Sequence, residues 1–245
     1  MSDTLYLSLW YPNLRLAGLA EKLTAVLGAF AAHGGEARVY SATVWPISWN
    51  ESPVFQQVYG RRVGARVDGA AALGAEPRLA VEEALELLHE DYAYEFQIGW
   101  SLWELESSPG NAGPSTALRS AQDDSALGED DSALKVDDSA LGGLDARWVR
   151  EPRLVRVTGF GPLFDDGAYE ADGHIRVDFG SDAPFLEEDL ELDSVAAERV
   201  EENVRQLVAL TAALEKDSGA TARLLWSELG ESLAARLAKR LKGAN

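Results

Sequence analysis

Cysteine is absent from this 245-residue sequence, which also contains only three histidines and one methionine. Without cysteine the chain forms no disulfide bond, and thiolate zinc sites and cysteine nucleophiles are excluded. No apolar run approaches the about 18 residues that a membrane-spanning helix needs. The first residues also lack the basic flank and the small-residue cleavage site of a secretory signal. These absences together predict a soluble, cytoplasmic protein without a membrane-bound part.

Basic residues are also few, with 22 lysines and arginines against 41 aspartates and glutamates and a formal net charge of −19. Nucleic acids and anionic membrane surfaces both attract proteins through clustered lysine and arginine. The charge therefore argues against either as a partner. It favours a basic protein partner if charge directs binding, whereas the simpler explanation is that it keeps the protein soluble. The excess of arginine over lysine and the richness in alanine and leucine indicate a GC-rich bacterial genome.

A heptad occurs three times in 123–143, as DDSALGE, DDSALKV and DDSALGG. One leucine and one alanine per copy bury too little apolar surface to offset the entropy of ordering the segment. One leucine per heptad is also too few for the seam of a coiled coil. We therefore predict a flexible, acidic, low-complexity insert over 106–146, which separates two halves of the same domain, 1–105 and 147–245.

Hydropathy patterns on both sides of this insert predict an α+β fold. Apolar residues alternate in 5–11, 92–103 and 175–179, as they do in strands with one buried face. In 14–32 and 194–216 they recur at helical spacing. The long alternation in 92–103 is typical of an antiparallel strand. We expect an antiparallel or mixed sheet covered by about four helices, interrupted by the long flexible insert in the middle of the chain.

The same alternation assigns polar side chains to the other side of these strands. Glu95 and Gln97 point away from the predicted core in one strand, and Arg176 and Asp178 do so in another. These positions carry no motif, and they are typical of any strand surface that faces solvent.

Seven tryptophans are many for a chain of this length. Trp100 and Trp103 have opposite parity in one predicted strand, so at least one of them faces away from the apolar side. We therefore predict a surface for a ligand or peptide that includes Trp49, Trp100 and Trp103. The alternative is that these rings pack in the core.

Acidic residues provide the candidate metal ligands. Asp165, Asp166 and Asp172 lie in predicted turns, and Glu187 opens an acidic run that ends at Asp193. Carboxylates are typical ligands of divalent cations, so under an alternative hypothesis these residues hold a metal ion. The EF-hand spacing is missing, however, and aspartates are common in turns for conformational reasons alone. No cofactor is predicted otherwise.

Enzyme motifs are missing from the sequence. It contains no Walker sequence, no dinucleotide-binding fingerprint and no Gly-x-Ser-x-Gly elbow. Glu86 and His89 form half of a carboxylate-bridged di-iron motif, but no second copy occurs.

From these patterns we predict a non-catalytic protein-binding module of the immunity or regulatory type, with an acidic surface and a basic partner. The alternative is an enzyme that depends on carboxylates or a divalent metal and uses the acidic region 165–193. A third hypothesis is a phosphate mimic that occupies the nucleic-acid site of a basic partner. Nothing in the sequence indicates the oligomeric state.

Overall fold

The computed structural model describes residues 3–60, 62–63, 66–67, 74–105, 148–186, 192–228 and 233–242. The insert predicted over 106–146 lies outside the described residues. The chain divides into two compact units, one formed by Met1–Glu104 with Arg150–Asn245 and the other by Leu105–Val149. The helices that the structure describes and the candidate site belong to the first unit.

A seven-stranded antiparallel sheet has the strand order β3-β2-β6-β7-β8-β1-β9. Its strands are β1 Thr4–Trp10, β2 Gly35–Pro46, β3 Phe55–Val58, β6 Tyr92–Leu105, β7 Trp148–Phe160, β8 Ile175–Ser181 and β9 Ala222–Ser227. β1 lies between β8 and β9, so it is paired on both sides with strands from the second half of the chain. Two short strands, β4 Arg62–Val63 and β5 Arg66–Val67, pair separately.

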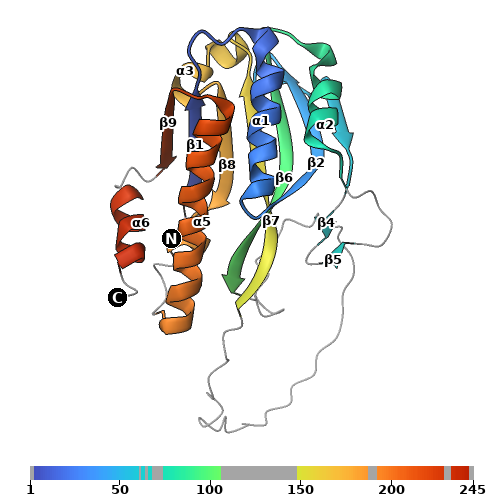
Figure 1. Cartoon of the computed structure of the whole chain (residues 1–245). Coiled ribbons are helices and arrows are strands. Elements are labelled where there is room, and N and C mark those ends of the chain that lie inside the picture. Colours follow the sequence, from blue (N-terminus) through green and yellow to red (C-terminus); the bar gives the residue numbers. More distant parts are fainter. Residues whose placement is uncertain are drawn as a thin grey trace, which may run out of the picture. The chain divides into compact units, whose positions relative to one another are not determined.

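Helices α1 (Leu19–Ala32), α2 (Pro77–Ala84) and α5 (Ser194–Ser218) lie side by side over one face of this sheet (Figure 1). α6 (Leu233–Lys242) packs against α5, whereas α3 (Tyr169–Asp172) and α4 (Ala183–Leu186) are single turns. The α+β class and the antiparallel sheet are thus confirmed. The described residues form six α-helices, so the expected cover of about four is not confirmed.

The core lies between the sheet and these helices. Leu5, Leu7 and Leu9 of β1 are fully buried there, together with Leu23 and Phe30 of α1. Side chains at the intervening strand positions point to the other side of the sheet, because successive residues of a strand alternate. We call this side, opposite to α1, α2 and α5, the second face of the sheet.

Capping residues explain where the main helices begin and end. Pro77 occupies the first turn of α2, where its missing N–H costs no hydrogen bond. The Asp193 side chain accepts a hydrogen bond from the backbone N of Ala196 at 2.8 Å and so caps the start of α5. Gly219, with a φ of 72°, ends that helix in the left-handed conformation that glycine adopts without strain.

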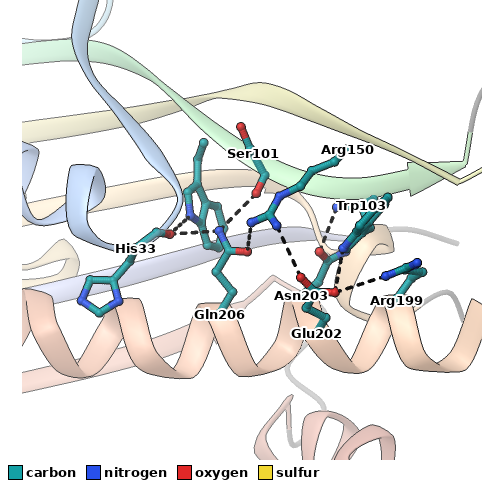
Figure 2. A network of polar contacts seen from close by, with 9 residues as sticks. His33, Ser101, Trp103, Arg150, Arg199, Glu202, Asn203 and Gln206 are labelled. Atoms are coloured by element: carbon teal, nitrogen blue, oxygen red, sulfur yellow. Dashed lines mark hydrogen bonds and ion pairs between the residues drawn. The ribbon is translucent and has the colours of Figure 1, made fainter.

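A polar network fastens α5 to β6 (Figure 2). The fully buried side chain of Asn203 accepts a hydrogen bond from the backbone N of Trp103 at 2.9 Å. It donates to the carbonyl oxygens of Trp103 and Pro184, both at 2.8 Å. One turn further along, Gln206 donates to the carbonyl oxygen of His33 at 2.9 Å. Directional bonds therefore fix the position of the helix on the strand in addition to apolar packing.

Candidate binding pocket on the second face of the sheet

The strand register aligns polar and aromatic side chains in rows across the second face. One row consists of the paired residues Trp226, Tyr6, Asp178 and Arg156, from β9 to β7. The next row consists of Leu224, Ser8, Arg176 and Thr158 on the same four strands. On the other half of the sheet, β6 pairs with β2 so that Glu95 lies opposite Thr43 and Ala93 lies opposite Trp45.

A cavity of about 350 Å³ opens among these residues. Pockets for small ligands have volumes of about 300–1,000 Å³, so this one has room for a small molecule or for one side chain of a partner. Five strands and the loop after β2 contribute its lining, which consists of Tyr6, Trp45, Trp49, Glu95, Arg156, Thr158, Arg176 and Asp178.

Other aromatic rings hold the indole of Trp49 in place. Its ring centroid lies 5.9 Å from that of Trp45, 5.1 Å from that of Phe164 and 6.1 Å from that of Phe160, each in edge-to-face geometry. Ala93, Phe160 and Phe164 form a small buried cluster on this side of the sheet, onto which Trp45 and Trp49 pack. The orientation of Trp49 is therefore set by packing within the protein.

The loop that carries Trp49 is tied to neighbouring segments through its backbone. The N–H of Ile47 donates to the carbonyl oxygen of Asp91 at 2.7 Å, and the carbonyl of Ile47 accepts from the N–H of Asp165 at 2.7 Å. Ile47 has a φ of 61° and Asp165 a φ of 46°. A β-branched residue rarely adopts this left-handed conformation. Backbone strain of this kind concentrates at functional sites, and here it lies in the loop that carries part of the cavity wall.

Both arginines of the cavity are paired with aspartates. Arg156 forms an ion pair with Asp178, and Arg176 forms one with Asp172 of α3. The guanidinium of Arg176 also lies 5.6 Å from the ring centroid of Tyr6, within the range of a cation–π interaction. Arg156 is thus paired within the lining, and Arg176 is paired with a residue outside it.

Two polar groups of the lining are left without a direct partner. In the part of the chain that the structure describes, the carboxylate of Glu95 forms no hydrogen bond or ion pair. Burial raises the pKa of Glu95, against the lowering effect of Arg156 and Arg176, and the charge of Asp178 raises it further. The Nε1 of Trp45 is buried and likewise lacks an acceptor among the described residues. Glu95 therefore offers unused acceptor capacity to the cavity, whereas the unpaired N–H of Trp45 is not accessible from it.

The tryptophans predicted to bind lie in three different environments. Trp49 lines the cavity, whereas Trp100 is fully buried in the core beneath the helices. Trp103 contacts α5, where its Nε1 donates to Glu202 at 2.8 Å and the guanidinium of Arg199 lies 4.0 Å from its ring centroid (Figure 2). The structure does not bring these three side chains together, and binding through them stays a prediction.

The candidate metal ligands are also dispersed. Asp165 and Asp166 lie in a short 3₁₀ turn, and Asp172 pairs with Arg176. Glu187 lies outside the described residues. Within the described ranges, no group of three or more histidines and acidic residues is placed to hold a metal ion. A metal-binding role stays a prediction.

Sequence patterns do not single out most of the cavity lining as a site. Alternation correctly places Glu95, Arg176 and Asp178 on the polar side of their strands. It does not reveal that β6 and β8 present these side chains to one cavity, because that depends on which strands pair and in which register. The sequence therefore contains a signal for the direction of these side chains, but none for their neighbours.

Two further findings concern the kind of protein. Among the residues whose structure is described, no helix combines the length and the apolar character needed to cross a bilayer. No protein-family model matches the chain, and the comparisons with curated proteins and with solved structures found no match either. Because these comparisons give no relative, a proposal about function has to start from the geometry of the cavity.

Proposed function

We propose that this chain is a cytoplasmic, non-catalytic protein-binding module of the immunity or regulatory type, which recognises a basic protein through the second face of its sheet. The observation that supports this most is the cavity of about 350 Å³, whose lining combines three aromatic residues with a carboxylate that forms no hydrogen bond or ion pair to a described residue. Aromatic residues and desolvated charged groups dominate the energetics of protein interfaces.

The chemistry of the lining favours recognition over covalent catalysis. As far as the structure describes it, the lining offers the hydroxyls of Tyr6 and Thr158 but no serine, cysteine or histidine. A nucleophilic hydroxyl needs an adjacent base within hydrogen-bond reach. Thr158 is only 4% exposed, and the Tyr6 hydroxyl donates to Glu228 at 3.0 Å, outside the cavity lining.

The charge of the molecule favours a basic partner. Arg156 and Arg176 each form an ion pair with an aspartate, whereas the carboxylate of Glu95 forms none among the described residues. The net charge of −19 acts over a longer range. A field of this sign speeds the encounter with a positively charged protein and opposes encounter with an acidic one.

Site-specific photo-crosslinking in the native host tests this proposal. A benzoylphenylalanine at Leu154 or Leu224 places the photoreactive group at an exposed strand position whose alternation assigns it to the second face. Leu154 precedes Arg156 of the lining by two residues, and Leu224 pairs with Ser8. The matched controls carry it at Leu79 of α2 and Val195 of α5, which are exposed to a similar degree on the helical side.

We expect one defined polypeptide, basic in composition, to be crosslinked from the two positions on the second face and not from the two helical positions. Crosslinks from the helical positions alone, or from none of the four, would show that the second face is not the recognition surface. A partner that is crosslinked from the second face but is acidic would contradict the charge argument.

A further inference from the structure

We propose that the cavity on the second face binds one cationic side chain of the partner, a lysine or an arginine, with its charged group at the carboxylate of Glu95. This inference rests on the proposed function and adds the chemical class of the group that is recognised. The carbon chain of the bound residue would lie against the rings of Tyr6, Trp45 and Trp49, which line the same cavity.

The first support is the carboxylate of Glu95. Arg156 and Arg176 each have an aspartate partner, Asp178 in the lining and Asp172 outside it. Within the described residues, Glu95 is the carboxylate of the lining that forms no ion pair. A cationic ligand supplies this carboxylate with a partner.

The second support is the aromatic wall. Cations are attracted to the faces of tryptophan and tyrosine rings, and the aliphatic stems of lysine and arginine pack well on the same surfaces. The guanidinium of Arg176 already lies 5.6 Å from the ring centroid of Tyr6 and 5.9 Å from that of Trp49. These rings therefore accept a cation in this environment.

Burial raises the pKa of Glu95, and this gives the binding a pH signature. The groups that act on this carboxylate are Arg156, Arg176 and Asp178. A cation binds the ionised carboxylate, so its affinity is full while Glu95 is ionised and falls as the pH drops through the raised pKa. Binding that depends on packing alone would not change in this way.

Titration of the full chain with model compounds tests the inference. The probes are Nα-acetyl-lysine N-methylamide and Nα-acetyl-arginine N-methylamide, with the norleucine and glutamate analogues as uncharged and anionic controls. Indole N–H signals of protein labelled with [¹⁵N]tryptophan report the binding. The signals of Trp45 and Trp49 are assigned with the variants Trp45→Phe and Trp49→Phe.

We expect saturable shifts of the Trp45 and Trp49 signals with the two cationic probes, and binding that weakens as the pH falls through the raised pKa of Glu95. Glu95→Gln should weaken binding by about tenfold, because it removes the charge and keeps the shape. The double variant Glu95→Gln/Gln97→Glu keeps the net charge and should bind as weakly. Glu86→Gln changes an exposed acid on the helical side and should bind like the wild type.

Equal binding of the norleucine probe, tighter binding of the glutamate probe, or no shift up to the solubility limit of the cationic probes would overturn the inference. If Glu95→Gln lowers the melting temperature strongly, Trp49→Phe replaces it as the test variant, with weaker cation binding expected.

Crosslinks from Leu154 without cation binding would leave the proposed function intact. Cation binding without crosslinks would instead indicate a free cationic metabolite and contradict the proposed function.

Discussion

Ile47, in the loop that carries Trp49, adopts a backbone conformation that is energetically unfavourable for its residue type. Its φ of 61° is in the left-handed region, although its side chain is β-branched and 58% exposed. The isoleucine side chain is not buried and does not belong to the apolar core, so packing does not explain why isoleucine occupies this position. Its backbone, by contrast, holds the Trp49 loop through hydrogen bonds to Asp91 and Asp165. The backbone conformation, not the side chain, is therefore what this position contributes to the site.

Replacement of this residue with one that tolerates the conformation should stabilise the protein. Ile47→Asn is expected to raise the free energy of unfolding by about 1 kcal/mol, because asparagine adopts left-handed φ values at lower cost. Urea unfolding monitored by tryptophan fluorescence measures the difference. Val54→Asn, at an exposed position with negative φ in the same loop, is the control and should not stabilise. A lower midpoint for Ile47→Asn would show that the site is not strained.

At the scale of elements, the position of α5 depends on one buried amide. Asn203 uses its oxygen for the backbone N of Trp103 and its nitrogen for two carbonyl oxygens, those of Trp103 and Pro184. It thereby connects α5, β6 and α4. Because the side chain is fully buried, water cannot replace a hydrogen bond that is lost there. Its hydrogen bonds therefore fix the orientation of α5 on β6 as well as stabilising the fold.

Loss of this amide should therefore be costly. Asn203→Ala leaves three backbone groups without their partner, one buried and two part-buried, and is expected to lower the free energy of unfolding by about 2–4 kcal/mol. Chemical denaturation gives the value. Glu198→Ala changes an exposed position of the same helix and should stay within about 0.5 kcal/mol of the wild type. A cost for Asn203→Ala as small as that of Glu198→Ala would mean that apolar packing alone positions the helix.

Comparison of individual strands and helices shows which elements can be predicted from the sequence and which cannot. Alternation predicts strands at 5–11, 92–103 and 175–179 and the polar direction of Glu95, and the structure agrees. The single turns α3 and α4 are too short for a periodic pattern, so the sequence does not predict them, and the expected cover of about four helices is not confirmed. The cavity is assembled from five strands by long-range pairing, which no local pattern encodes.

At the scale of the whole molecule, several tyrosines couple stability to alkaline pH. Burial raises the pKa of Tyr11 to about 12, although the hydrogen bond with Ser218 lowers it. Burial also raises the pKa of Tyr94 to about 12. Each phenol is thus kept neutral in the folded chain at pH values where an exposed tyrosine, with a pKa of 10.0, has begun to ionise.

Stability should consequently fall as the pH rises from about 10 to about 12. In this range the unfolded chain has lost protons that the folded chain still holds, so ionisation favours unfolding. Below pH 10 the contribution of both tyrosines is fully present. Melting temperatures across this range measure the effect, and the double variant Tyr11→Phe/Tyr94→Phe should show a smaller slope. An unchanged slope in that variant would place the alkaline sensitivity elsewhere in the protein.

The place of β1 between β8 and β9 has a consequence for biosynthesis. Its leucines are made early, but the strands that flank it follow only near residues 175–181 and 222–227. At about 5–20 residues per second, a ribosome needs roughly ten to forty seconds to supply both neighbours. Neither edge of this apolar strand is covered until β8 is made, and one edge stays open until β9 follows. The nascent protein therefore depends on protection of this segment, by a chaperone or by transient local collapse, until the late strands enclose it.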